Sequence, residues 1–188
     1  MSASPRGQLF VVSGPSGVGK GTVTRRVLEA NPNLRLSVSA TTRPPREGEI
    51  DGRDYRFVSG SEFDRLVAEG AFLEWAEVFG HRYGTLRVPI ERELDAGHDV
   101  VLEIDVQGAA QVLERSPSAV LIFLEPPSEE ELARRLRARG TESEDGLQIR
   151  LAGARWEMEQ RPWFHHVVRN DDLEQAASDL AAIIARTH

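Results

Sequence analysis

The sequence predicts an α/β fold, in which helices flank a parallel sheet. Short apolar runs with β-branched residues alternate with amphipathic segments, and a glycine-rich loop joins the first apolar run to a helix. The stretch 40–88 is hairpin-like and interrupts that alternation, so we expect an inserted antiparallel subdomain there. An arginine-rich pair of helices within 128–161 predicts a helical lid, and the ligand is expected at the carboxyl ends of the strands.

Length and composition set limits on function. With 188 residues, 40% of them hydrophobic, the chain can bury one core, and its formal charge of −7 has the wrong sign for a general nucleic-acid surface. It has no cysteine, and its five histidines show no metal-ligand spacing. No run reaches the roughly 18 apolar residues that span a bilayer, and residues 1–7 lack an apolar signal region. We therefore expect a cytoplasmic protein with no nucleic-acid or membrane partner; its oligomeric state does not follow from the sequence.

The strongest signal is a phosphate-binding loop. The apolar run 8–13 predicts a buried strand, and a helical stretch follows the loop. The loop consists of Gly14, Pro15, Ser16, Gly17, Val18, Gly19, Lys20, Gly21 and Thr22. Small residues at this spacing let main-chain N–H groups converge on phosphate oxygens at a helix N-terminus, and Lys20, the single lysine of the chain, adds a positive charge. The loop predicts a nucleotide site on a P-loop NTPase-like sheet.

One position departs from the usual loop pattern. A serine or threonine normally follows the lysine and approaches Mg²⁺, whereas this chain has Gly21 there and a hydroxyl one residue later, at Thr22. Glu103 and Asp105, near the end of an apolar run, are the other candidates, because acidic residues at strand ends of such folds orient Mg²⁺ or substrate. We expect Mg²⁺ as cofactor and leave open whether it is contacted directly or through water.

The remaining elements follow from periodicity and capping signals. Further strands are expected at 34–39, 54–59, 71–80, 99–105, 119–124 and 167–168. Helices are expected at 61–69 with Ser61 as its cap, at 89–96 with Gly97 at its end, at 132–139 after a Ser128–Glu131 capping box, in the arginine-bearing stretch 147–161, and at 173–184. A loop is expected at 140–146, between the two lid helices.

Six motifs, in order, make the chain resemble the guanylate kinases, bacterial type, which phosphorylate GMP with ATP, along nearly its whole length. They are GPSGVGKGT, SVSATTRPPREGEIDGRDYRFVS, FLEWAEVFGHRYGT, LEIDVQGA, RRLRARGTE with the later IRL, and VVRNDDL. The resemblance implies a single domain with a core of 8–39, 89–127 and 162–188, a GMP-binding subdomain at 40–88 and a lid at 128–161. It implies the substrates ATP and GMP and leaves dGMP open.

The resemblance also implies the site residues. Those for GMP are Ser39, Arg43, Arg46, Tyr55, Glu74, Tyr83, Thr85 and Asp105, in which two arginines and two tyrosines clamp the phosphate and the other residues surround guanine. A clamp of guanidinium forks and phenolic donors suits a phosphate dianion, and a carboxylate suits the adjacent N1–H and 2-amino donors of guanine. The implied catalytic residues are Lys20, Arg43, Arg135, Arg139 and Arg150. Asn170 matches a position near the adenine, with helix capping as the alternative role.

The implied reaction is in-line transfer of the γ-phosphoryl group of ATP to a phosphate oxygen of GMP, which needs no general base because the acceptor is already anionic. Three rival hypotheses are a guanylate-kinase-like module that binds a protein partner, a related kinase of another small phosphate such as a ribose bisphosphate, and an adenylate kinase. The intact phosphate loop argues against the first, the TTRPPR segment and the carboxylate beside Trp75 against the second, and Ser39 with Glu74 against the third.

Overall fold

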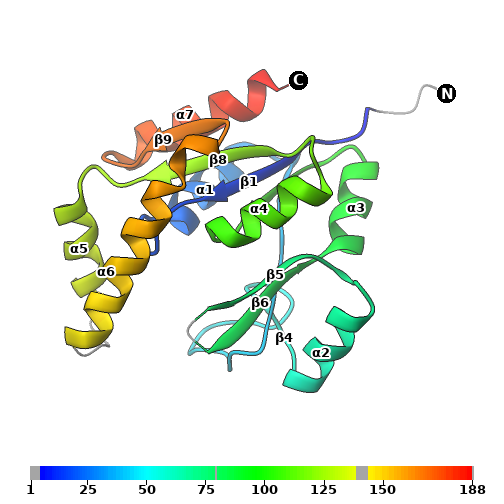
Figure 1. Ribbon diagram of the computed structural model, residues 1–188. Helices are drawn as coiled ribbons and strands as arrows, with labels where there is room; N and C mark the ends of the chain where they lie inside the picture. Colours follow the sequence, from blue (N-terminus) through cyan, green and yellow to red (C-terminus); the bar gives the residue numbers. More distant parts are fainter. Residues whose placement is uncertain (1–4, 79, 139–143, 188) are drawn as a thin grey trace. The chain divides into compact units, whose positions relative to one another are not determined.

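The computed structural model describes residues 5–78, 80–138 and 144–187, and its fold is α/β as predicted. The strands are β1 (Leu9–Ser13), β2 (Leu34–Leu36), β3 (Ala40–Thr41), β4 (Arg56–Phe57), β5 (Phe72–Val78), β6 (His81–Leu86), β7 (Asp99–Glu103), β8 (Val120–Glu125) and β9 (His166–Arg169). The helices are α1 (Lys20–Ala30), α2 (Gly60–Ala68), α3 (Arg87–Asp95), α4 (Val106–Arg115), α5 (Glu129–Ala138), α6 (Glu144–Glu159) and α7 (Leu173–Arg186), with a 3₁₀ turn at Arg161–Trp163 (Figure 1).

The strands form two sheets. The first has five strands in the order β2-β7-β1-β8-β9, and the pairings β2 with β7, β1 with β8 and β8 with β9 are parallel, which confirms the predicted parallel sheet. The second has four strands in the order β4-β3-β6-β5. Its β5–β6 and β3–β6 pairings are antiparallel as expected, whereas β3 pairs with β4 in parallel.

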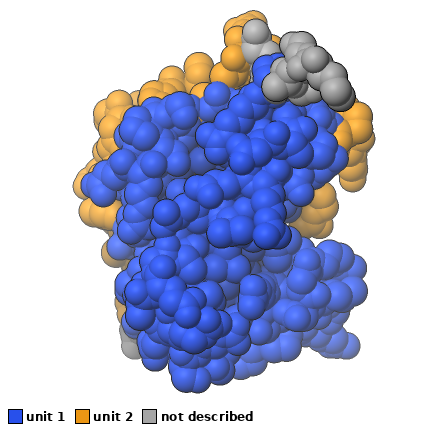
Figure 2. Space-filling model, turned by 90° about the vertical axis from the view of Figure 1, so that its right-hand side faces the viewer, with its two compact units in different colours: residues 1–9, 33–102, 107–119 blue, residues 10–32, 103–106, 120–188 orange. Residues whose placement is uncertain are grey.

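The chain divides into two compact units, which Figure 2 shows in different colours. Unit 1 comprises residues 1–9, 33–102 and 107–119, and unit 2 comprises residues 10–32, 103–106 and 120–188. The division of the chain into core, GMP-binding subdomain and lid given above remains a prediction.

Unit 2 is built on the buried strands β1 and β8. Phe10, Val11 and Val12 of β1 have no exposed surface, and residues 121–124 of β8 are equally buried. Helix α1 packs on α7, whose apolar stripe includes Ala176, Leu180 and Ile184. Helices α5 and α6 lie side by side (Figure 1), joined through the buried residues Leu132, Leu136, Leu147 and Ala154. The parallel strands are therefore buried on both faces, as their continuous apolar runs indicate.

Unit 1 contains the second sheet and a separate small core. Phe63 of α2 stacks on Phe72 of β5 with ring centroids 4.6 Å apart, and Ala40 and Leu66 complete the cluster. Helix α4 fixes β5 through side chains that bind main-chain groups. Gln111 accepts from the N–H of Trp75 at 3.2 Å and donates to its carbonyl at 2.8 Å, and Arg115 donates to the carbonyl of Leu73 at 2.6 Å. The residue between them, Glu74, is thereby held from both sides.

Several predicted boundaries were wrong. The cap of α2 is Ser59, whose hydroxyl accepts from the N–H of Glu62, because the helix begins two residues earlier than its apolar face suggests. The strands expected at 34–39 and 54–59 shorten to three and two residues. Helix α6 already begins at Glu144, inside the expected loop 140–146, whose residues 140–143 lie outside the described residues. Helix α4 was missed. Within the described residues, no helix is long and apolar enough to cross a membrane.

Candidate active site

The phosphate-binding loop of unit 2 has the backbone that the sequence predicts. Gly14 has φ +137°, and a Cβ added to it would lie 2.2 Å from the carbonyl oxygen of Leu124. Gly19 has φ +99°, directly precedes α1, and leaves no room for a Cβ, which would lie 2.7 Å from Nδ2 of Asn170. Only glycine fits both positions, because a side chain would meet a strained φ and an occupied space. The loop therefore delivers its main-chain N–H groups to the N-terminus of α1, where an anion is stabilised.

Lys20 closes this loop from the first position of α1. Its Nζ donates to the carbonyl of Gly14 at 2.6 Å, and the carbonyl of Pro15 lies 3.4 Å away. The ammonium group thus spans the loop from its end back to its first two residues, Gly14 and Pro15. A phosphate held by the loop N–H groups would meet this positive charge without a large movement of the side chain.

Three side chains from outside the loop bind its main chain. Asn170, which is buried, donates from Nδ2 to the carbonyl of Val18 at 2.7 Å, and Arg135 of α5 donates to the same carbonyl at 3.3 Å. Glu157 of α6 accepts from the N–H of Ser16 at 3.1 Å. Burial raises the pKa of Glu157, while Lys20 and the Ser16 N–H act in the opposite direction. These contacts tie the two helices of the expected lid and the segment before α7 to the loop.

A group of buried polar atoms lies where β1 and β7 end. Within the described part of the chain, the hydroxyls of Ser13 and Thr24 and Oε1 of Glu103 are buried without a well-aligned hydrogen bond. Burial raises the pKa of Glu103, and the Thr24 hydroxyl and the charges of Lys20 and Arg25 act in the opposite direction. Oε2 of Glu103 would lie 3.4 Å from a Cβ on Gly21. A carboxylate with an unpartnered oxygen beside a phosphate loop suits a cation or a bound water.

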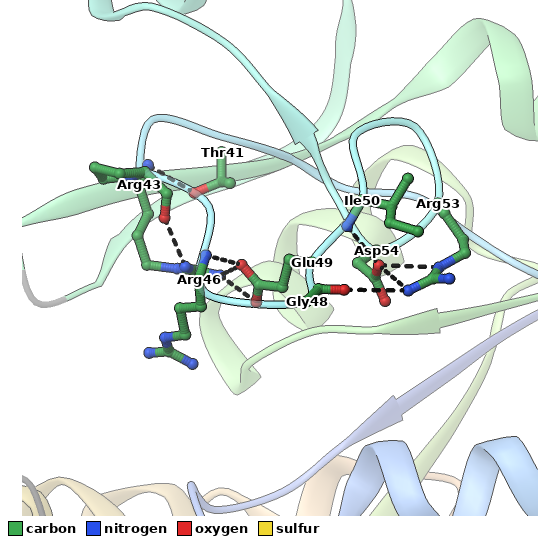
Figure 3. A network of polar contacts seen from close by, with 9 residues as sticks. Thr41, Arg43, Arg46, Gly48, Glu49, Ile50, Arg53 and Asp54 are labelled. Atoms are coloured by element: carbon green, nitrogen blue, oxygen red, sulfur yellow. Dashed lines mark hydrogen bonds and ion pairs between the residues drawn. The ribbon is translucent and has the colours of Figure 1, made fainter.

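Unit 1 holds a second cluster of cationic and aromatic side chains. Arg43 is buried, with 8% of its surface exposed, and its guanidinium lies 5.4 Å from the ring centre of Tyr55. The rings of Tyr55 and Tyr83 meet edge to face at 6.0 Å, and hydrogen bonding to Glu49 first, then to Tyr83, raises the pKa of Arg43. Glu49 binds Arg43 through both carboxylate oxygens, and Figure 3 shows this pair beside Arg46, whose guanidinium points away from the carboxylate. The cluster can bind an anion.

A buried carboxylate and hydroxyl form the third part of the site. Glu74 and Thr85 are direct partners across β5 and β6, with exposed fractions of 4% and 1%. The hydroxyl of Thr85 donates to Oε1 of Glu74 at 2.6 Å. A charged acceptor fixed in this way suits a ligand with neighbouring N–H donors. Ser39 lies next to β3 in the same sheet, and its carbonyl accepts from the N–H of Arg56 at 2.9 Å.

Comparison with known proteins identifies the family. The profile described as guanylate kinase matches residues 6–187, almost the entire chain. The chain belongs to the guanylate kinase family. It is 56% identical to the guanylate kinase of Thermus thermophilus over 179 residues, which cover 95% of this chain and 81% of the relative. It is 53% identical to the guanylate kinase of Neisseria gonorrhoeae over 184 residues, which cover 98% and 90%.

A solved guanylate kinase has the same fold. The crystal structure of the enzyme from Anaplasma phagocytophilum superposes with a TM-score of 0.82 at 38% identity, covering 98% of this chain and 87% of that one. Family membership confirms the resemblance on which the site residues were predicted. It does not test the individual roles, which remain proposals.

The structure places the predicted residues of this guanylate kinase in two groups. Unit 2 holds the phosphate loop with Lys20 and Thr22, and also Asp105, Arg135, Arg150 and Asn170. Unit 1 holds Ser39, Arg43, Arg46, Tyr55, Glu74, Tyr83 and Thr85. Thr22 is exposed on α1, Arg150 is half-buried on α6, and Arg139 lies outside the described residues. The capping role considered for Asn170 is wrong, because Asp172 caps α7 by accepting from the N–H of Gln175 at 2.9 Å.

Sequence reasoning missed Glu49 and Glu157. Each is one glutamate among 30 acidic residues, and no spacing rule singles it out. Glu49 stands within the SVSATTRPPREGEIDGRDYRFVS motif, three residues after Arg46, and that proximity to the predicted phosphate clamp is the signal that could have found it. Glu157 carries no comparable signal.

Proposed function

We propose that this protein transfers the γ-phosphoryl group of ATP to GMP, yielding ADP and GDP. The observation that carries the proposal is the intact phosphate loop, in which Lys20 binds the Gly14 carbonyl and Gly14 and Gly19 have no room for a side chain. A module that used this fold only to hold a protein partner would gain nothing from so constrained a loop. Membership of the guanylate kinase family supports the acceptor.

ATP binds in unit 2. The loop N–H groups hold the phosphates, and Lys20 exchanges its contact with the Gly14 carbonyl for phosphate oxygens. Arg135 and Asn170 fix the loop from outside through the Val18 carbonyl, and Arg150 lies on the same lid helix as Glu157. We assign Arg135, Arg139 and Arg150 to the charge of the transferring group, which matches the family resemblance.

GMP binds in unit 1. Arg43, Arg46, Tyr55 and Tyr83 hold its phosphate, because this cluster supplies the charge and the donors that a dianion needs. The Glu74 carboxylate reads the N1–H and 2-amino group of guanine, with Ser39 and Thr85 of the same unit as further contacts. Adenine presents no such pair of adjacent donors, so the buried pair of Glu74 and Thr85 favours guanine.

The residues at the end of β7 fit Mg²⁺. Oxygen donors suit this ion, and Oε1 of Glu103 is buried without a hydrogen-bond partner among the described residues. Glu103 and Asp105 would hold the ion, with Thr22 as a further oxygen donor; Gly21 has no side-chain oxygen. Bound there, Mg²⁺ would neutralise and orient phosphate oxygens.

The chemistry left to the protein is positioning and charge stabilisation. The GMP phosphate is an anion at neutral pH and attacks the γ-phosphorus of ATP without a general base. The phosphate loop and Lys20 hold the donor in line with the acceptor, and the arginines stabilise the charge that develops on the equatorial oxygens. Exclusion of water keeps the phosphoryl group from hydrolysis.

The proposal is tested by ADP release in a coupled assay with ATP and each of GMP, AMP, CMP and UMP. We expect rapid ADP release with GMP and little with the other three nucleotides. Equal turnover with AMP would assign the protein to another nucleoside monophosphate, and ADP release that does not depend on any acceptor would reveal an ATPase.

A further inference from the structure

We infer that Glu49 is a positioning residue for GMP binding: its carboxylate holds Arg43 and the loop of Arg46 in the conformation that accepts the phosphate. This inference rests on the proposed function of the cluster. It adds to that cluster an acidic residue, whose negative charge would be expected to repel a phosphate. The contacts of Glu49 explain why it is there.

Glu49 binds both arginine-bearing parts of the loop. Nη2 of Arg43 donates to Oε1 and Oε2 of Glu49 at 2.8 and 2.9 Å, and the main-chain N–H of Arg46 donates to Oε2 at 2.7 Å. Nη1 of Arg43 donates to the carbonyl of Pro44 at 2.7 Å. Figure 3 shows the bonds from Arg43 Nη2 and from the Arg46 N–H converging on the carboxylate. Glu49 thus fixes the guanidinium plane of Arg43 and the backbone at Arg46 at once.

The pair is largely shielded from water. The side chains of Arg43 and Glu49 are 9% and 19% exposed, and the ring of Tyr55 lies against the guanidinium. A buried guanidinium without a counter-ion is costly, so in the absence of Glu49 the side chain of Arg43 would turn toward water. The ion pair therefore keeps the guanidinium of Arg43 within the cluster that is proposed to bind the phosphate. Consistent with a maintained pair, hydrogen bonding to Arg43 lowers the pKa of Glu49.

The turn that carries Glu49 holds it in place independently of any ligand. The N–H of Glu49 donates to the carbonyl of Arg46 at 3.1 Å, while the Glu49 carboxylate accepts from the N–H of Arg46. These reciprocal bonds span only three residues, and Gly48, with φ +83°, allows the chain to turn. Glu49 uses N–H groups on Nη2 of Arg43 and leaves the arginine's contact with Tyr83 in place. The Arg46 guanidinium points away from Glu49 (Figure 3), so a phosphate can bind this cation without displacing the carboxylate.

The test compares Glu49→Gln with Glu47→Gln, a matched change at an exposed position two residues away. Glutamine keeps the size of Glu49 but has only one acceptor oxygen. Its NH₂ group is a donor and would face the N–H donors of Arg43 and Arg46. We expect Glu49→Gln to raise KM for GMP about 10- to 100-fold, with KM for ATP and the affinity for guanosine, which lacks the phosphate, unchanged. Glu47→Gln should behave as wild type. In Arg43→Ala, adding Glu49→Gln should raise KM for GMP much less than it does in wild type, because only the bond from Glu49 to the N–H of Arg46 is then left to lose.

The outcomes separate this inference from the proposed function. If wild type does not turn over GMP, the proposed function fails. If wild type does and Glu49→Gln leaves KM for GMP within about twofold or lowers it, or if the two substitutions multiply independently, the inference alone fails. Should Glu49→Gln not fold, a crystal structure of the wild-type protein with GMP decides. We expect the Glu49 carboxylate to remain bonded to Arg43 beside the phosphate; replacement of the carboxylate by the phosphate would overturn the inference.

Discussion

Replacement of Glu74 by alanine tests how the protein selects guanine. Glu74 is 4% exposed and receives the Thr85 hydroxyl at 2.6 Å, so truncation leaves that hydroxyl and two guanine donors without their charged acceptor. Each hydrogen bond to a charged group contributes about 1.5–3 kcal/mol, and water entering the vacated space recovers part of the loss. We therefore expect a net cost of about 2–3 kcal/mol, or a loss of roughly 30- to 150-fold in selectivity.

The assay is the ratio of kcat/KM for GMP to kcat/KM for AMP, measured by coupled ADP release. Thr85→Val serves as the graded control, since valine has nearly the shape of threonine and removes only the hydroxyl that holds Glu74. It should lower the ratio less than Glu74→Ala does, because the charged acceptor for the guanine donors stays in place and only its fixation is lost. Circular dichroism melts establish that both variants are folded. A ratio for Glu74→Ala within about threefold of wild type would refute the assignment of Glu74 as the base reader.

Three further predictions follow from the same geometry. Lys20→Ala should lower kcat by about 10²–10³-fold in the coupled assay with an unchanged melting temperature, because its ammonium group binds loop carbonyls and is not part of an apolar core; near-normal turnover would refute its role. Arg43→Ala should mainly raise KM for GMP, whereas Arg150→Ala should mainly lower kcat, and steady-state kinetics that reverse this pattern would contradict the assignment. Burial raises the pKa of Glu157, so the native state favours its protonated form, and wild-type stability falls as pH rises through that pKa. At pH 4, Glu157→Gln should therefore have the same melting temperature as wild type. At pH 8 its melting temperature should be higher, by about 2–4 °C for each kcal/mol of relieved desolvation. Equal melting temperatures of variant and wild type at both pH values would contradict this reasoning.

Much of the fold followed from short-range patterns. The continuous apolar runs of β1 and β8 predicted buried parallel strands, and the spacing of the glycines and Lys20 predicted the phosphate loop. Ser128 caps helix α5 as expected, because its hydroxyl accepts from the N–H of Glu131 at 3.1 Å. The second half of the capping box is absent, because the Glu131 carboxylate binds Arg134 and Arg135 instead.

What could not be predicted depends on contacts between distant parts of the chain. Helix capping was one of the two roles considered for Asn170, yet its amide donates to Val18, 152 residues earlier in the sequence. Helix α4 was missed although its buried residues Val106, Ala109 and Val112 fall at helical spacing, whereas the bonds of Gln111 and Arg115 to β5 could not be read from any local pattern. Glu49 and Glu157 each bind a partner that only folding brings near, so their residue type alone could not distinguish them from surface glutamates.

The most direct test of the account follows the phosphoryl group itself. Incubation with ATP whose γ-phosphorus is radiolabelled and made chiral with oxygen isotopes, in the presence of GMP, reports both the destination and the stereochemistry of transfer. Direct in-line transfer predicts that the label appears in the β-phosphate of GDP with inverted configuration, and that Lys20→Ala forms this product about 10²–10³-fold more slowly. Label recovered as inorganic phosphate, on the protein, or in GDP with retained configuration would contradict direct transfer from ATP to GMP.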